Sequence, residues 1–324
     1  MLPNYLILTP DGVGSTYLQR ALTVYLNCAG KDYYNPHELL NGLQLKNDML
    51  LRKQDASYNW LYEYSQTVED ICSMLQQAKN KLVCRIAKYH ITRRLQQYDH
   101  TEDYEKFYQV CNKVFDKKLF CTRDPFEYAM SWSIRNKTDM LNMYTVKDRK
   151  DMHFNMDVDV NFFKQKLSEY GDYEFWVKDN FTNLVAVDYD RFHYNPDNEL
   201  HNITGYEHAV TSKFDISLKD YGILRYMFSK EHNNKNYKND KIFRQQYKKV
   251  LTLHEYISTL LSESKMVTWM PIKMRTMEDK REMVANFDQM IEVYNLWAET
   301  TNIHQPVTEE TIQDKITQEK KLYG

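Results

Sequence analysis

The stretch that decides the fold lies near the start of the chain and reads Tyr5-Leu6-Ile7-Leu8-Thr9-Pro10-Asp11-Gly12-Val13-Gly14-Ser15-Thr16. Its apolar run, 5–8, predicts a short buried strand. We expect a helix to begin at Ser15 or Thr16, because apolar residues then recur at the spacing of one helix face, at Leu18, Ala21, Leu22, Tyr25 and Leu26. Gly30 suits the end of that helix. The chain therefore opens with a strand, a glycine-containing loop and a helix.

Three more apolar runs have the character of buried strands, and they lie at 81–87, 118–122 and 183–187. Each is short, apolar on both faces and separated from the next by a helical pattern, which is typical of a parallel sheet covered by helices. Helices are expected at 59–79, 102–115, 125–138, 160–170, 216–230, 240–262, 279–300 and 308–321. The last third shows no strand pattern, so we expect a helical cap with a solvated, charged tail over 309–321.

The pattern indicates one α/β domain over residues 1–324, with a core at 1–192 and a helical extension at 215–324. Neither an internal repeat nor a linker rich in Pro or Ser divides the chain. The polar stretch 231–241 is the expected exposed loop.

The composition excludes several classes of protein. The 324 residues include 43 Lys and Arg against 45 Asp and Glu, and this near-balance argues against a nucleic-acid-binding protein. With 42% hydrophobic and 27% charged residues, the chain is globular rather than disordered. Only 8 residues are Gly, which excludes collagen-like and linker-rich chains and makes the two glycines in the first loop informative.

Cysteine usage and the absence of targeting patterns predict a cytoplasmic protein with no membrane association. The five cysteines form no C-x-x-C pair, which favours a reduced, intracellular chain. Residues 1–10 lack the features of a signal peptide, and no stretch approaches the roughly 18 apolar residues of a membrane span. No His or Cys cluster has zinc-binding spacing, so no metal site is expected.

The glycine loop, residues 9–16, has the arrangement that binds phosphate. Backbone N–H groups of the loop and of the helix start can point at an anion, and the hydroxyls of Ser15 and Thr16 add donors. The alternative is an ordinary turn between a strand and a helix, in which Ser15 caps the helix. The loop is not a Walker A motif, because Gly14 is followed directly by Ser15 without the lysine that neutralises the β- and γ-phosphates.

The third predicted strand runs into Arg123-Asp124-Pro125, and Pro125 suits the first turn of a helix. Arg123 is therefore expected at the carboxyl edge of the sheet, where ligands bind in open α/β folds. Ser131 follows two helical turns later, so the two side chains could jointly hold a second phosphate. The alternative is an arginine paired with Asp124 or Glu127 beside a solvent-facing serine.

Together these features resemble the sulfotransferases that use 3′-phosphoadenosine 5′-phosphosulfate (PAPS). The glycine loop resembles that family's 5′-phosphosulfate loop, and 85–91, with Lys88 and His90, is similar to its Lys-x-His segment. Arg123 and Ser131 have the family's spacing for the 3′-phosphate, and 184–190 resembles its Tyr-Glu-Asp segment. The resemblance covers roughly residues 4–192. It implies a three-layer sandwich like that of the P-loop NTPases.

The resemblance also implies an activity, the transfer of a sulfonate group from PAPS to a hydroxyl or amine of a small-molecule or glycan acceptor. Lys88 would steady the sulfonate and His90 would take the acceptor's proton, the two sharing one face of extended chain. For His90 the alternative is a buried structural histidine. No metal is implied. The residues implied in binding the co-substrate PAPS are Gly12, Val13, Gly14, Ser15 and Thr16 at the 5′-phosphate, and Arg123 and Ser131 at the 3′-phosphate.

Two departures from the family keep other interpretations open. Cytosolic members carry a lysine where this loop has Gly12, so the neutralising charge is expected from Lys88 or Arg20. The family's late Gly-x-x-Gly-x-x-Lys segment is also absent. A non-catalytic nucleotide-binding or structural protein on the same fold remains an alternative. A kinase-like phosphotransferase is a further one, disfavoured by the missing Walker lysine.

The acceptor pocket is expected to be built by the long insertion between the first and second predicted strands and by the helical C-terminal third. The residues Tyr33, Tyr34, Trp132 and Trp176 suit such a pocket as well as they suit ordinary packing. The segment 188–190 is expected to brace the edge of the sheet rather than to react. The sequence does not indicate the oligomeric state.

Overall fold

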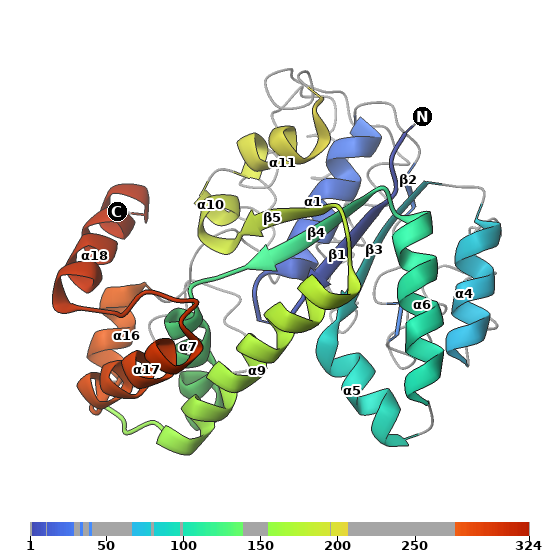
Figure 1. Cartoon of the computed structure of the whole chain (residues 1–324). Coiled ribbons are helices and arrows are strands. Elements are labelled where there is room, and N and C mark those ends of the chain that lie inside the picture. The colour runs from blue at the N-terminus through green and yellow to red at the C-terminus, as the bar shows by residue number, and fades with distance from the viewer. Residues whose placement is uncertain are drawn as a thin grey trace, which may run out of the picture.

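The computed structural model describes residues 2–10, 12–28, 33–34, 39–40, 67–78, 81–97, 100–138, 155–194, 196–206 and 276–323. Its strands are β1 (Tyr5–Thr9), β2 (Tyr33–Tyr34), β3 (Lys81–Ala87), β4 (Lys117–Thr122) and β5 (Leu184–Asp188). They form a parallel sheet in the order β2-β3-β1-β4-β5 (Figure 1). The predicted α/β fold is confirmed, and β1 lies between β3 and β4.

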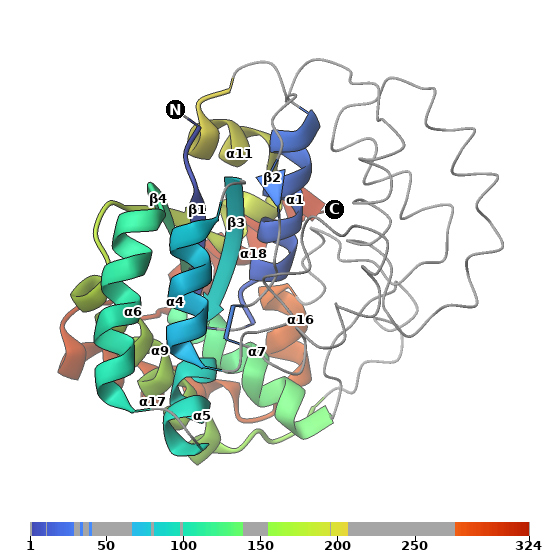
Figure 2. The ribbon, with the colours of Figure 1, turned by 90° about the vertical axis from the view of Figure 1, so that its right-hand side faces the viewer.

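Helices connect and cover these strands. In the first part of the chain they are α1 (Ser15–Cys28), α4 (Val68–Gln77), α5 (Lys88–Gln97), α6 (Thr101–Val114), α7 (Pro125–Thr138), α9 (Val160–Asn180), α10 (Tyr189–Tyr194) and α11 (Pro196–Thr204). The C-terminal part adds α16 (Met277–Met283), α17 (Phe287–Thr301) and α18 (Glu309–Tyr323). Figure 2 shows α4 and α6 on one side of the strands and α1 on the other.

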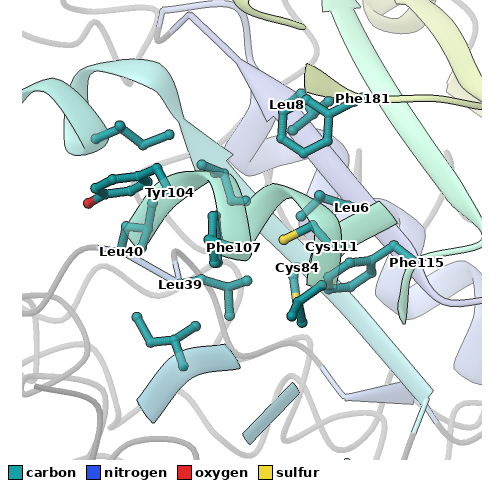
Figure 3. Close-up of a cluster of buried hydrophobic side chains, with 14 of the residues drawn as sticks. Leu6, Leu8, Leu39, Leu40, Cys84, Tyr104, Phe107, Cys111, Phe115 and Phe181 are labelled. Atoms are coloured by element: carbon teal, nitrogen blue, oxygen red, sulfur yellow. The ribbon is translucent and has the colours of Figure 1, made fainter. Parts of the chain in front are cut away.

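The alternation of side chains along β3 explains these two layers. Leu82, Cys84 and Ile86 belong to an apolar cluster that the sheet shares with α4, α6 and α9 (Figure 3). The residues between them face the other way, and Arg85 there reaches α1. Both faces of the strand are buried, which is typical of a parallel sheet covered by helices.

A second apolar cluster joins the C-terminal helices to the core. Phe126 of α7 packs edge to face against Phe163 of α9 and against Phe287 and Tyr294 of α17. Side chains of α16 and α18 complete the cluster. The helical character of the C-terminal part is therefore confirmed for residues 276–323, and these helices pack directly on α7 and α9.

Several predicted elements differ from the observed ones. Residues 88–97 form helix α5, which the sequence pattern did not predict. Helix α9 extends ten residues past the predicted end at 170, because Tyr173, Trp176 and Val177 continue its buried face. The predicted helix 279–300 is two helices, interrupted where Val284 pairs with Met156.

The charged tail over 309–321 was predicted to be solvated, and this is wrong for one face of α18. Ile312, Ile316 and Glu319 are buried against the second cluster or against α16. The predicted helices 216–230 and 240–262, the loop 231–241 and residues 59–66 lie outside the described residues. None of the described helices is long and apolar enough to cross a membrane.

Candidate functional site

The strand register brings the predicted segments to one edge of the sheet. Thr9 pairs with Ala87, so the glycine loop and Lys88 leave adjacent strands at the same level. Thr122 pairs with Asp188, so Arg123 leaves β4 beside the start of α10. The carboxyl ends of β3, β1 and β4 therefore lie side by side, and the glycine loop after β1 lies between Lys88 and Arg123.

The glycine loop has the backbone that its glycines predict. Gly12 has a φ of +71° and Gly14 a φ of +65°, a region that costs little only for glycine. The carbonyl of Gly14 accepts the first hydrogen bond of α1, from Leu18 N, at 3.0 Å. Val13 and Ser15 are buried. Thr16 lies in the first turn of α1, but its side chain is outside the described part.

Trp132 of α7 fills the space that a side chain at position 12 would need. A Cβ atom on Gly12 would lie 2.8 Å from the indole Nε1 of Trp132. A side chain at position 12 would therefore need Trp132 to move. Lys166 of α9 instead places its ammonium 4.7 Å from the ring centre of Trp132. The sequence did not single out Lys166, while the side chain of Arg20 is outside the described part.

Arg123 and Ser131 are brought together as predicted. Arg123 Nη2 donates to Ser131 Oγ at 3.0 Å, and Arg123 Nη1 donates to the carbonyl of Gly12 at 3.0 Å. The guanidinium also lies 4.2 Å from the ring centre of Tyr189. Tyr170 of α9 fixes the backbone, because its hydroxyl accepts from Arg123 N and donates to Arg123 O. One buried arginine thus links the glycine loop to α7.

The alternative carboxylate partner of Arg123 is present as well. Glu127 Oε2 lies 3.8 Å from Arg123 Nη2. Burial acts to lower the pKa of Arg123, but four neighbours together outweigh it and raise that pKa, so the guanidinium stays charged; these are Tyr189, Glu127, Asp190 and Asp124. Glu127 also forms ion pairs with two lysines. Its Oε2 lies 2.6 Å from Lys280 Nζ of α16, and its Oε1 lies 3.2 Å from Lys315 Nζ of α18. Sequence reasoning missed both lysines, because only tertiary packing brings them here.

A second buried arginine flanks the loop on its other side. Arg85 Nη1, on β3, donates to Ser15 Oγ at 3.1 Å. Arg85 is only 4% exposed, and a charge at that depth needs polar partners. An arginine in the middle of an apolar strand was the signal that could have identified it.

Lys88 and His90 do not occupy an extended segment. They lie in the first turn of α5, where residues two apart point in different directions. Lys88 is partly buried, and this burial lowers its pKa, while Asp172 and Glu169 act in the opposite sense. His90 is 2% exposed, and its ring centre lies 4.0 Å from that of Tyr89. The role of His90 as a base stays a prediction.

Two cavities adjoin these residues. The first, of about 520 Å³, is called the Lys88 cavity, and its lining includes Pro10, Lys88, Trp132, Lys166 and Asp172. The second, of about 500 Å³, is called the Arg123 cavity, and its lining includes Arg123, Asp190, Arg191, His304 and Lys315. The Lys88 cavity lies on the glycine-loop side of the sheet's carboxyl edge, and the Arg123 cavity lies on its β5 side.

The aromatic residues proposed for an acceptor pocket divide between cavity and core. Trp132 lines the Lys88 cavity. Tyr33 is buried in β2 and donates to Pro3 O, and Trp176 is buried and donates to the hydroxyl of Tyr108. The latter two are core residues, whereas the side chain of Tyr34 lies outside the described part.

The segment 188–190, predicted to brace the sheet edge, contacts α10, Arg123 and α18. Asp188 accepts from Arg191 N at the start of α10, Tyr189 lies against Arg123, and Asp190 binds Lys315. Among the described residues, no group of His, Cys, Asp or Glu side chains has the arrangement of a metal site. Models of known protein families do not match this chain, and neither do the sequences of curated proteins.

Proposed function

We propose that the chain is a PAPS-dependent sulfotransferase, which transfers a sulfonate group to a hydroxyl or amine of an acceptor. The observation that carries this proposal is the position of Arg123. Its guanidinium contacts both Ser131, eight residues later, and the carbonyl of Gly12 in the glycine loop. A ligand with two phosphate groups would explain why a loop suited to one phosphate adjoins an Arg–Ser pair suited to another.

In this proposal the two ends of the nucleotide have separate binding groups. The backbone of Gly12, Val13 and Gly14 and the start of α1, with Ser15 and Thr16, hold the 5′-phosphate. Arg123 and Ser131 hold the 3′-phosphate, which distinguishes PAPS from ordinary adenosine nucleotides.

The transfer itself depends on position and charge. As in phosphoryl transfer, the acceptor oxygen or nitrogen attacks in line while the bond from sulfur to the 5′-phosphate oxygen breaks. Lys88, the first residue of α5 and beside the loop, would stabilise the charge that develops on the sulfonate and the leaving oxygen. His90 remains the predicted acceptor of the proton. Lys166, which pairs with Glu169 at 2.6 Å, is a further lysine beside Trp132, near the position where Gly12 stands in place of the family's lysine.

The first experiment measures thermal stability with nucleotides. The desulfated product, 3′-phosphoadenosine 5′-phosphate (PAP), should raise the melting temperature, because it carries both phosphates. Adenosine 5′-phosphate (AMP) should have a smaller effect, since it lacks the 3′-phosphate. Stabilisation by ATP with Mg²⁺ alone would overturn the proposal and favour a kinase-like protein.

The second experiment separates an active enzyme from a non-catalytic one. Radiolabelled sulfonate from PAPS should appear on members of a panel of phenols, sugars and amines, and His90→Ala should abolish transfer while PAP still binds. Retained turnover in His90→Ala would refute the base assignment. PAP binding without transfer to any acceptor would favour the non-catalytic alternative.

A further inference from the structure

Three buried tyrosines lie at the carboxyl edge of the sheet, Tyr128 on α7 and Tyr170 and Tyr173 on α9. Their rings pack in a row, with centres 4.9 Å apart between Tyr128 and Tyr170 and 6.0 Å apart between Tyr170 and Tyr173. Each residue is at most 2% exposed, and a hydroxyl at that depth needs a hydrogen-bond partner. The hydroxyls of Tyr170 and Tyr173 have their partners in the backbone of β1, β4 and Arg123.

The hydroxyl of Tyr173 lies where two strands of the sheet separate. The pairing of β1 with β4 ends at Leu8 and Phe120, and beyond that pair β1 continues along β3 while β4 continues along β5. Tyr173 Oη lies 2.7 Å from Leu8 O and 2.9 Å from Cys121 O, so a carbonyl of β1 and a carbonyl of β4 share its one proton. In open α/β sheets, ligands bind at such a separation of strands, and here one hydroxyl of α9 spans it.

The hydroxyl of Tyr170 is bound twice to the same residue. It accepts from Arg123 N at 2.9 Å and donates to Arg123 O at 2.6 Å. Arg123 comes one residue after the end of β4, and its backbone takes these two partners from α9 rather than from a neighbouring strand. Arg123 is only 7% exposed, so the loss of the hydroxyl would leave buried polar groups without these bonds, which is costly.

The backbone that the two hydroxyls hold leads directly into the proposed nucleotide site. Leu8 comes one residue before the glycine loop, and Cys121 comes two residues before Arg123. The distance between these two strand ends therefore sets the distance between the groups proposed for the 5′-phosphate and for the 3′-phosphate. A nucleotide that binds at both places requires that distance to be fixed before it arrives.

The two tyrosines act through this backbone rather than through contact with a ligand. Tyr170 borders the Arg123 cavity and Tyr173 borders the Lys88 cavity, but they are only 1% and 0% exposed. Burial raises the pKa of both hydroxyls, so each keeps the proton that it donates.

We propose that Tyr170 and Tyr173 are positioning residues of the nucleotide site. Tyr170 holds the backbone of Arg123 where its guanidinium reaches Ser131 and the 3′-phosphate. Tyr173 holds the glycine loop and Arg123 at the spacing that one nucleotide spans. This inference rests on the proposed function, because it takes the ligand to carry both phosphates.

The test measures the dissociation constants of PAP and AMP by calorimetry, and the melting temperature without ligand, in Tyr170→Phe, Tyr173→Phe and Tyr33→Phe. Each change removes one oxygen and keeps the ring. Tyr33 is the matched control, because it is 2% exposed and its hydroxyl also donates to a backbone carbonyl, Pro3 O, at 2.6 Å. It lies in β2 beside the first residue of β3, at the opposite end of the sheet from the site.

The two α9 variants should affect the nucleotides differently. Tyr170→Phe should weaken PAP binding about tenfold and leave AMP binding within about twofold of the wild type, because only PAP has a 3′-phosphate for Arg123. Tyr173→Phe should weaken both nucleotides by about 3- to 10-fold, because it releases the strand that carries the glycine loop. Tyr33→Phe should lower the melting temperature without changing either dissociation constant.

The remaining outcomes separate this inference from the proposed function. A wild-type protein that does not bind PAP would overturn the proposed function itself. A wild type that prefers PAP to AMP, with the same preference in Tyr170→Phe, would overturn the role of Tyr170 alone, and unchanged constants in Tyr173→Phe would do so for Tyr173. Weakening of both nucleotides in Tyr33→Phe to the same extent as in the α9 variants would show that reduced stability is the cause, and would overturn the inference for both residues.

Discussion

Two arginine–serine pairs flank the glycine loop, and different parts of the chain hold them. Arg85 donates to Ser15 at 3.1 Å, and Arg123 donates to Ser131 at 3.0 Å. The first pair joins β3 to α1, both elements of the central α/β unit. The second is tied through Glu127 to α16 and α18. The two sides of the site are therefore held by different elements of the fold. A substitution on one side should affect the binding of a two-phosphate ligand differently from a substitution on the other.

The largest effect is expected from Arg123→Met, which removes the contacts to Gly12 and Ser131 at once. Because Arg123 and Ser131 are the groups proposed for the 3′-phosphate, PAP binding should weaken by about 100-fold or more, the range expected for two bonds from a charged donor. AMP binding should change far less. Calorimetry on the two nucleotides measures the difference, with Arg281→Met, a surface change in a pair with Glu309, as the control. Equal losses for both nucleotides would mean that the two sides are not separate.

Gly12 connects the two supports, since its carbonyl accepts from Arg123 while its backbone belongs to the loop. Gly12→Ala combines a left-handed φ of +71° with a contact of 2.8 Å to Trp132. The expected loss in the free energy of unfolding is about 3 kcal/mol, the sum of backbone strain and overpacking. Gly205→Ala is the matched control, because its φ is +72° but nothing lies within 4 Å of its added Cβ.

Backbone strain alone should lower the free energy of unfolding of Gly205→Ala by about 1 kcal/mol, which denaturant unfolding measures. A Gly12→Ala variant as stable as Gly205→Ala would show that Trp132 moves aside readily. In that case the loop would have room for a larger residue at position 12.

A smaller effect is expected from Arg85→Met, which leaves the Arg123 side intact. Ser15 loses the donor that fixes its hydroxyl, so the 5′-phosphate site is disturbed. PAP and AMP share this phosphate, and both should bind about tenfold more weakly, as for one lost charged hydrogen bond. Selective loss of PAP binding would reverse the assignment of the two sides.

The two arginine pairs also show how far the sequence predicts the site. Arg123 and Ser131 lie on one strand end and the following helix, so local spacing was enough to predict that they meet. Arg85 and Ser15 are 70 residues apart, and only the parallel pairing of β1 with β3 brings them together. The hydrophobic runs predicted the strands, because a buried strand must be apolar on both faces.

The C-terminal contribution was not predictable by the same means. Lys280 and Lys315 look like ordinary surface charges in amphipathic helices, and the pattern over 309–321 was taken for a solvated tail. Burial of Lys280 against Glu127 depends on how α16 packs on α7, which helix periodicity does not specify. Similarly, α5 begins directly after β3, so the apolar run gave no signal that Lys88 and His90 lie on a helix.

The smallest effect concerns Lys88, which lies on the Arg85 side of the loop. Its pKa is lowered from the ordinary value of 10.5, chiefly by burial, so its ammonium loses a proton at a lower pH than that of a free lysine. If Lys88 contacts the sulfonate, the affinity for PAPS should fall as the pH rises through this lowered pKa.

Lys88→Arg keeps its charge over the whole range, so its PAPS affinity should persist to higher pH. PAP lacks the sulfonate, and its affinity should depend on this titration less than that of PAPS in either protein. The experiment measures the affinities of PAPS and of PAP for the wild type and for Lys88→Arg by calorimetry across the alkaline range. The same alkaline decline in wild type and Lys88→Arg would place the titrating group elsewhere and remove Lys88 from the sulfonate.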